Sequence, residues 1–433
     1  MAIKSFYGTG YGLSGNPFPQ SGIYGPDKEM VYVPEVFGPT HDQFLRKFIL
    51  APLENGQPLT GALWSVAKGD PRARGFGKST LMGEEAKRIN SDFGRSTLVA
   101  LGVPEEDASD NPIMAGYVTF DAKSYGGITN IDSAAFHLMR FMVRCTGADG
   151  QSIHKRLRTR AIAALSKDWD IEEDGEEATI IAAVRERFHN LSLTIDIRNK
   201  LEEFLGALAS EDEDVLDDVV NNVGTWHHDR NGLKYLQIFT VFAELANVSH
   251  MTFFVDQVED FTTEANPKKI RKNVKIIRDA LIEAEPFASN ASFVFQLHPQ
   301  AYSKLRDAWE HEDLPSLEMG KRLNEDSIVV LKGLETFESA KLLANRMMND
   351  PSIALPIRKG KGITPFTDEA MKKVWEATRP IPRHFLEALH RLLRQGMTNR
   401  KDEIDLDFVA KRLEIDDNEV ESDETNATDD RLA

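Results

Sequence analysis

Residues 62–80 have the sequence ALWSVAKGDPRARGFGKST, and this stretch decides the fold. It opens with a short apolar run, residues 62–67, bounded by turn residues, which is typical of a buried strand. A loop rich in glycine, proline and arginine follows, and a helix is predicted from Lys78 to about Ile89. A strand, a glycine loop and a helix in this order provide the setting that a phosphate-binding loop requires.

The end of this loop carries its chemistry. Six residues are predicted to surround the phosphates of ATP: Gly75, Phe76, Gly77, Lys78, Ser79 and Thr80. Glycines let backbone N–H groups turn inward around phosphate oxygens, and the helix that follows adds its positive N-terminal end. Lys78 is predicted to reach the β- and γ-phosphates, Ser79 to bind Mg²⁺, and Thr80 to lie near the α-phosphate.

The spacing of the loop departs from the common pattern. A glycine is usual five residues before Gly77, but Arg72 stands there, and Gly69 lies three residues further upstream. The loop is therefore longer or differently bent. The alternative is a chance occurrence of Gly-Lys-Ser, since roughly 0.2 such matches are expected in a chain of this length at ordinary residue usage. The strand and helix around the match favour the functional interpretation.

A second candidate site follows residues 251–255, whose sequence MTFFV is the most strand-like run in the chain. The strand is followed directly by Asp256, and Glu259 lies three residues further on. A carboxylate at Asp256 is predicted to hold the Mg²⁺ shell opposite the Ser79 hydroxyl. Glu259 is predicted to orient the attacking water, because Gln257 cannot act as a base. The alternative is that these acids are solvated side chains at a strand end.

Strands alternate with helices through the central part of the chain. Further strands are predicted at residues 117–120, 292–297 and 327–331, and helices at residues 131–143, 233–246 and 267–284. Alternation of this kind favours an α/β fold with a parallel, doubly wound sheet, which is the core of a P-loop NTPase.

Composition divides the chain further. The predicted domains are a lead-in segment at residues 1–60, a P-loop ATPase core at residues 61–335 with a helical insertion at residues 150–230, a helical lid domain at residues 336–413, and an acidic disordered tail at residues 414–433. The tail carries nine acids and one arginine, so it has too few apolar groups to build a core.

Composition also excludes several classes of protein. The 433 residues carry a net charge of −17, which argues against a surface that coats nucleic acid as a whole. One cysteine, Cys145, excludes an internal disulfide and a thiolate zinc site. The N-terminal residues lack an apolar signal-peptide region, and no run of about 18 apolar residues exists. A cytoplasmic protein without a membrane span is therefore expected.

With these motifs, the chain resembles the AAA+ and STAND P-loop ATPases, including the origin-recognition type of AAA+ ATPase. Asp256-Gln-x-Glu259 after an apolar strand is similar to the DQFEE form of STAND ATPases. The RGFGKST loop at residues 74–80 is similar to the R-G-x-G-K-[ST] form of both groups. Asn16-Pro17-Phe18 resembles the lead-in of bacterial AAA+ transposition and secretion ATPases. The resemblance covers roughly residues 10–110, 235–350 and 365–410.

The resemblance implies roles for four further residues. A polar sensor of the γ-phosphate is expected near the end of the strand at 292–297, at Gln296 or His298; the alternative for His298 is a helix cap or a core position. Arg322 matches an arginine that reaches the nucleotide of a neighbouring subunit, against an ordinary surface arginine. Arg383, in a segment similar to the G-x-P-R motif of the lid, is expected to touch the γ-phosphate, against a solvated helix N-terminus.

The expected cofactors are ATP and Mg²⁺, and the expected reaction is ATP hydrolysis that drives a conformational change of an assembly. A protein partner or self-assembly is expected. Nucleic acid is a second candidate partner, through the basic helix at residues 268–278, for which a solvated helix face is the alternative. A DNA-associated role of origin, transposition or defence type stays open. The rival hypothesis is a nucleotide-gated scaffold that binds ATP with little hydrolysis and recruits a partner protein.

Overall fold

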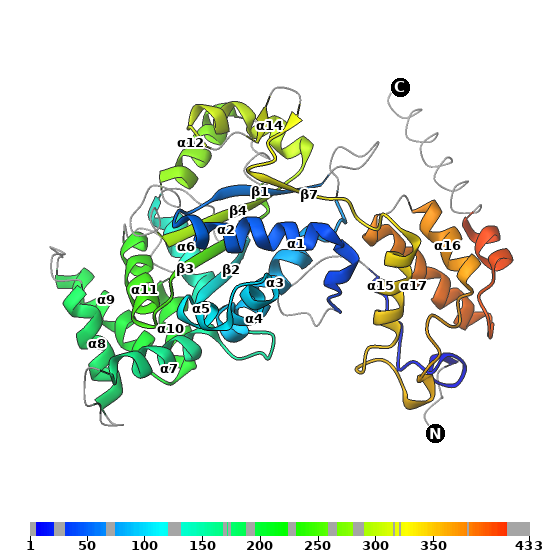
Figure 1. Ribbon diagram of the computed structural model, residues 1–433, viewed down its shortest axis with the longest axis horizontal. Helices are drawn as coiled ribbons and strands as arrows, with labels where there is room; N and C mark the ends of the chain where they lie inside the picture. Colours follow the sequence, from blue (N-terminus) through cyan, green and yellow to red (C-terminus); the bar gives the residue numbers. More distant parts are fainter. Residues whose placement is uncertain are drawn as a thin grey trace, which may run out of the picture. The chain divides into compact units, whose positions relative to one another are not determined.

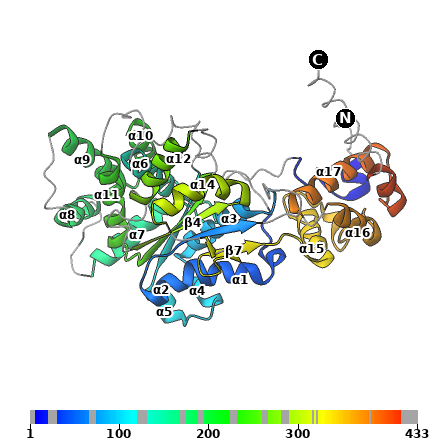
Figure 2. The ribbon, with the colours of Figure 1, turned by 90° about the horizontal axis from the view of Figure 1, so that it is seen from above.

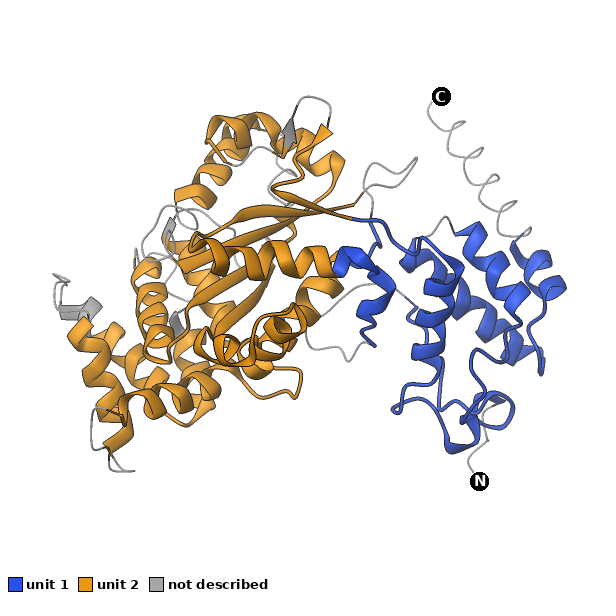
Figure 3. Ribbon diagram, in the orientation of Figure 1, with its two compact units in different colours: residues 1–41, 74–77, 331–433 blue, residues 42–73, 78–330 orange. Residues whose placement is uncertain are grey.

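The structure is a computed structural model, and it describes residues 6–20, 31–65, 74–119, 131–167, 171, 175–187, 195–223, 231–258, 266–279, 290–314, 317–319, 322–378 and 381–413. The chain divides into two compact units (Figure 3). Unit 1 consists of residues 1–41, 74–77 and 331–433, and unit 2 consists of residues 42–73 and 78–330. The two units are defined by contacts between residues in space, so their bounds differ from those of the predicted domains. The division into functional domains stays a prediction.

A five-stranded sheet forms the centre of unit 2. Its strands are β1 (Thr60–Ser65), β2 (Ile113–Thr119), β3 (His250–Asp256), β4 (Ala291–Leu297) and β7 (Ile328–Leu331). Their spatial order is β2-β3-β4-β1-β7, and the pairs β2/β3, β3/β4 and β4/β1 are parallel. The carboxyl ends of these strands therefore meet at one edge of the sheet, with β4 between β1 and β3. The predicted α/β fold with a parallel, doubly wound sheet is confirmed.

Helices cover both faces of the sheet, so the strands are apolar almost throughout instead of alternating. On one face, Phe44 packs on Phe254 with ring centroids 5.4 Å apart. On the other face, Trp64 packs on Tyr302, with ring centroids 5.7 Å apart. Figures 1 and 2 show α1 (Pro39–Leu45) on the first side of the sheet and α12 (Pro267–Ile277) and α14 (Pro299–His311) on the second.

The remaining helices of unit 2 connect and flank these strands. Outside the insertion they are η3 (Arg46–Leu50), α2 (Ala51–Asn55), α3 (Lys78–Asp92), α4 (Arg95–Ala100), α5 (Glu105–Asp110), α6 (Ile131–Val143) and α11 (Gly232–Leu245). The helix at 131–143 has the predicted bounds. The sequence pattern did not predict α4, α5, α14 or the antiparallel pair of short strands β5 (Glu318–Met319) and β6 (Arg322–Leu323). It also predicted β2 from residue 117 only, because Ala115 and Gly116 have low strand propensity.

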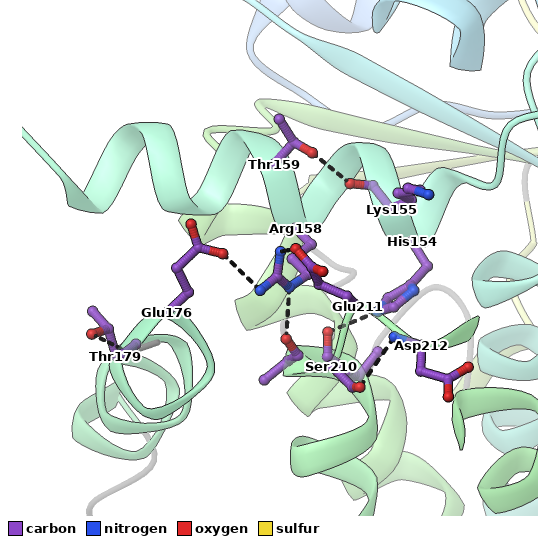
Figure 4. Close-up of polar contacts among 12 residues, drawn as sticks. His154, Lys155, Arg158, Thr159, Glu176, Thr179, Ser210, Glu211 and Asp212 are labelled. Carbon is purple, nitrogen blue, oxygen red and sulfur yellow. Dashed lines mark hydrogen bonds and ion pairs between the residues drawn. The ribbon is translucent and has the colours of Figure 1, made fainter. Parts of the chain in front are cut away.

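In its described residues, the segment at 150–230 contains α7 (Ile153–Leu165), α8 (Glu176–Arg187), α9 (Ile195–Ala209) and α10 (Glu213–Val223). The first three pack on α11, and α10 packs on α9. The buried Arg158 of α7 joins their ends (Figure 4). Its guanidinium donates to Glu176 at 2.8 Å, to Glu211 at 2.9 Å and to the carbonyl of Ala209 at 2.8 Å. Because a buried cation needs such acceptors, this arginine fixes how α8 and the end of α9 pack against α7.

The described part of unit 1 contains the helices α15 (Phe337–Met348), α16 (Asp368–Ala377) and α17 (Pro382–Thr398) and a further helical stretch at residues 406–413. The short helices η1 (Tyr7–Tyr11), η2 (Pro34–Phe37) and η7 (Pro356–Arg358) accompany them. The lead-in motif belongs to this unit. Asn16 donates to the carbonyl of His390 at 3.0 Å, and the Phe18 ring is buried in the core of the unit. Asn16-Pro17-Phe18 therefore fastens the lead-in segment to α17.

No helix in the described part of the chain has the length and apolar character needed to cross a bilayer.

A buried histidine makes the stability of unit 2 depend on pH. His250 opens β3, and its Nε2 lies 2.8 Å from the Ser292 hydroxyl of β4. Burial lowers the pKa of the imidazole to about 4. An unfolded histidine titrates near pH 6.5, so between these values the unfolded chain binds more protons and stability falls as the pH falls.

We therefore expect the free energy of unfolding of unit 2 to decrease by about 3 kcal/mol from this group as the pH is lowered from 7 to 4. Urea titrations at a series of pH values measure this loss. His250→Asn, which keeps a polar side chain without the titration, should have a smaller dependence on pH than the wild type. Identical pH dependence in the two proteins would contradict the assignment.

Candidate functional site

Three strands bring polar residues to one edge of the sheet. Asp256 ends β3 and pairs with Thr119 of β2, and Gln296 of β4 pairs with Leu63 of β1. The pair Val255–Phe295 precedes Asp256 and Gln296, so these two residues are neighbours across β3 and β4. Residues two apart in a strand point to the same face. Ser65, two residues after Leu63, therefore lies on the same face as Gln296 and Asp256.

Helix α3 starts over this edge. Its first residue, Lys78, is buried, and its Nζ donates to the Ser65 hydroxyl at 2.5 Å. The next residue, Ser79, donates from its hydroxyl to Oε1 of Gln296 at 3.0 Å. Two successive residues of α3 are thus hydrogen-bonded to the ends of β1 and β4. These bonds place the N-terminus of a fifteen-residue helix, whose first N–H groups have no acceptor within the helix and whose dipole end is positive, at the strand edge.

The turn before α3 favours glycine at two positions. Gly75 and Gly77 both have φ of 84°, in the left-handed region that other residues rarely adopt. A Cβ at Gly75 would lie 2.6 Å from the Cβ of Arg383, and one at Gly77 would lie 3.3 Å from the Phe37 ring. Phe76 between them is buried. The local conformation therefore fits a loop whose backbone approaches phosphate groups.

The carboxylate of Asp256 is held in a fixed orientation. It is buried, and it accepts hydrogen bonds from the hydroxyl of Tyr117 and, at 2.7 Å, from the N–H of Gln257. Gln257 has a φ of 61°, so the chain turns sharply at the strand end and directs this N–H back to the carboxylate. Sequence reasoning missed Tyr117. Only the pairing of β2 with β3, which the sequence does not reveal, brings its ring beside Asp256.

The two candidates at the end of β4 have different surroundings. Gln296 contacts Ser79, as described above. His298 is the N-cap of α14, and its Nδ1 accepts from the N–H of Ala301 at 3.2 Å. His298 therefore occupies the helix-cap position that was predicted as the alternative to a sensor role. Of the two candidates, Gln296 is the one whose side chain contacts the start of α3.

The other predicted site residues are spread over both units. Thr80 lies in the first turn of α3 and is half-buried. Arg322 lies in β6 of unit 2 with an exposed side chain, in register with Met319 of β5. Arg383 lies in the first turn of α17 in unit 1, where its backbone N–H donates to the carbonyl of Gly75 at 3.1 Å. Glu259, together with the start of the loop at Gly69 and Arg72, lies outside the described residues.

The residues at the sheet edge fit ATP with Mg²⁺. The N-terminus of α3 supplies N–H donors for phosphate oxygens, and Lys78 supplies a cation. The Ser79 hydroxyl and the Asp256 carboxylate are oxygen ligands of the kind that Mg²⁺ prefers, beside phosphate and water. Within the described residues no three His, Cys, Asp or Glu side chains group as metal ligands. A site with one carboxylate, one hydroxyl and the phosphates does not need such a group.

The fold defines the class of the protein: an α/β chain with a parallel, doubly wound sheet and a helical unit. No protein-family model matches the chain, and no curated protein matches its sequence. Among solved structures, the ORC2 protein of Aeropyrum pernix, described in ADPNP–ADP complexes, aligns with a TM-score of 0.40 and 9% sequence identity. The alignment covers 88% of this chain and 71% of that chain. A likeness at this level supports no assignment, which rests instead on the strand order, the glycine turn and the edge residues.

Tyr117 should act on the metal through Asp256. Without its hydroxyl the carboxylate loses one of its two fixed donors, and removal of such a supporting partner typically weakens metal binding by about 10- to 100-fold. We therefore expect Tyr117→Phe to raise the Mg²⁺ concentration needed for half-maximal ATP binding or hydrolysis by about tenfold.

Tyr302→Phe is the matched control, because Tyr302 is also buried but packs on the opposite face of the sheet, against Trp64. Its Mg²⁺ midpoint should equal that of the wild type. A folded Tyr117→Phe protein with an unchanged Mg²⁺ midpoint would show that the hydroxyl serves packing alone.

Proposed function

We propose that this chain is an AAA+-type ATPase that couples nucleotide state to a conformational change of an assembly. The observation that carries the proposal is the pair of hydrogen bonds from Lys78 and Ser79 to the ends of β1 and β4, next to the buried Asp256 at the end of β3. This arrangement brings a cation, a hydroxyl, a carboxylate and a helix N-terminus to one edge. The narrower resemblance to STAND ATPases rests on the spelling Asp256-Gln-x-Glu259 alone.

Each edge residue has a role in phosphoryl transfer to water. Lys78 binds the β- and γ-phosphate oxygens, and the N–H groups of the glycine turn orient them. Ser79 and Asp256 hold Mg²⁺, which when bound neutralises charge that develops on the phosphate oxygens. Glu259 orients the attacking water. Gln296 of β4 accepts a hydrogen bond from the Ser79 hydroxyl, which is the proposed Mg²⁺ ligand. A change at the γ-phosphate that moves Ser79 therefore also moves the Gln296 side chain.

The glycine turn contacts the first turn of α17 within unit 1. Within unit 1 the carbonyl of Gly75 accepts from the N–H of Arg383, and a Cβ at Gly75 would collide with the Arg383 side chain. A movement of the turn that follows nucleotide binding therefore displaces the first turn of α17. This contact supports the role of Arg383 as a lid residue that senses the γ-phosphate.

The rival function is a nucleotide-gated scaffold that binds ATP with little hydrolysis and recruits a partner. Gln257 favours it, because the residue after Asp256 cannot act as a base and its N–H is bonded to the carboxylate. The rate of phosphate release distinguishes the two functions.

Phosphate release from three variants tests the division of roles. Glu259→Gln should keep ATP binding and lose most hydrolysis, since it removes the group that orients water. Asp256→Asn should also raise the Mg²⁺ requirement. Arg322→Ala should lower turnover with ATP affinity unchanged, because a trans-acting arginine stabilises charge that develops in the transition state.

The exposed position of Arg322 also predicts that wild-type turnover per chain rises with protein concentration. Slow release by the wild type and equal release by all three variants would favour the scaffold. Turnover that stays constant from a monomer to about a hundredfold higher concentration would remove Arg322 from the reaction.

A further inference from the structure

The α12 helix carries the strongest local concentration of positive charge in this acidic chain. Residues 266–279 contain six Lys and Arg residues and one acid, whereas the whole chain has a net charge of −17. The helix starts at Pro267 with Asn266 as its N-cap, whose side chain accepts from the N–H of Lys268. A local basic surface on a chain of negative net charge is suited to an anionic partner.

The cations of α12 lie on one face. Ile270, Val274 and Ile277, spaced four and three residues apart, are buried beneath the helix. The helix packs on α14 and α6, and it lies beside α14 at the periphery of unit 2 (Figures 1 and 2). The exposed positions are occupied by Lys268, Lys269, Arg271, Lys272 and Lys275. The packing thus turns the basic side of α12 to solvent.

Acidic neighbours neutralise only part of this face. Glu312, at the end of α14, pairs with Arg271 at 3.2 Å and with Arg278 at 4.0 Å. Asp279, which follows α12 in the chain, pairs with Lys275 at 3.2 Å. Among the described residues, no carboxylate pairs with Lys268 or Lys272. These two lysines are four residues apart, which is one turn of the helix and about 6 Å.

The chemistry of the face favours a nucleic-acid backbone over an acidic protein. Lysine is depleted at protein interfaces, where buried aromatic and apolar anchors carry the affinity. The large apolar side chains that are exposed in the described residues, Val99, Val215, Ile357 and Leu406, all lie outside α12. A row of lysines without such anchors is suited to phosphates, which are bound by charge.

The two arginines argue for binding without sequence preference. Arg271 and Arg278 are both engaged by Glu312, so their guanidinium groups are already committed to a carboxylate. Arginine is the side chain that most often reads guanine in the major groove, whereas lysine neutralises phosphates as a point charge. Among the described residues, Lys268 and Lys272 are the exposed cations of α12 that no carboxylate engages.

We propose that the exposed lysine face of α12 binds the phosphate backbone of nucleic acid without reading its sequence. In this proposal Lys268 and Lys272 contact the phosphates directly, because no acidic side chain of the described residues pairs with either lysine. Lys269 and Lys275 lie on either side of these two lysines. Each contact releases counterions from the nucleic acid, so binding weakens steeply as salt increases. The proposal does not rest on ATP hydrolysis.

Fluorescence anisotropy with the full chain and a labelled duplex of about 30 base pairs of scrambled sequence tests this surface. The variant Lys268→Glu/Lys272→Glu should bind the duplex at least about tenfold more weakly than the wild type near 0.1 M salt. The slope of log affinity against log salt should become smaller by about 2, because two phosphate contacts are lost. Lys268→Arg/Lys272→Arg keeps the charge and should retain the wild-type affinity and slope.

The matched control is Lys372→Glu/Lys373→Glu on α16 of unit 1, which makes the same change of net charge at two other exposed helical lysines. It should bind the duplex as the wild type does. ATP affinity, measured in every variant, reports that the core is folded and keeps this test separate from that of the ATPase.

Three results would overturn the proposal. One is an equal loss in the α12 variant and the control, which would assign the effect to net charge. The second is no duplex binding by the wild type even at low salt. The third is binding of polyglutamate in place of the duplex, which would make the face a docking surface for an acidic protein.

Discussion

The tie between the start of α3 and the ends of two parallel strands is the interaction on which the rest of the site depends. Lys78 and Ser79 are consecutive residues, and their side chains reach Ser65 of β1 and Gln296 of β4. Since β4 stands between β1 and β3, this tie also places the helix N-terminus beside Asp256. A parallel sheet is what makes the arrangement feasible, because it collects all these strand ends at one edge.

Buried aromatic side chains on both faces of the sheet hold the strand ends in place. Phe44 of α1 packs on one face of the sheet, and Trp64 of β1 packs on Tyr302 at the other face. The buried rings on both faces exclude water from the strands. A rigid, dry sheet fixes the polar groups at its ends, so little reorganisation is needed when an anion binds. The same logic explains Tyr117, which rises from β2 to hold the carboxylate of Asp256. The edge is thus organised by neighbours within the sheet and not by the loop alone.

Much of this could be read from the sequence where the signals are local. The glycine turn, Lys78 at the start of a helix, the helix at residues 131–143 and the apolar strand before Asp256 all follow from short-range patterns. The α/β class followed from their order. These features depend on neighbours in the chain, so one sequence suffices to predict them.

What the sequence left open depends on contacts between distant residues. Tyr117 lies 139 positions from Asp256, and only strand pairing brings them together. The choice between Gln296 and His298 required the position of α3 as well as the strand phase. Asn16-Pro17-Phe18 resembled a family lead-in, but its contacts with α17 involve residues more than 370 positions away. Arg158 likewise gathers acceptors from α8, α9 and the following turn.

The central claim is that the start of α3 binds the phosphates of ATP, and an ATP titration by calorimetry tests it most directly. Lys78→Ala should weaken ATP binding by roughly ten- to a hundredfold, because a charge-assisted contact worth about 1.5–3 kcal/mol is lost. Lys87→Ala is the matched control, since this lysine lies on the same helix and pairs with Glu84. It should bind ATP as the wild type does. Equal ATP affinity in the wild type and a folded Lys78→Ala protein would contradict the account.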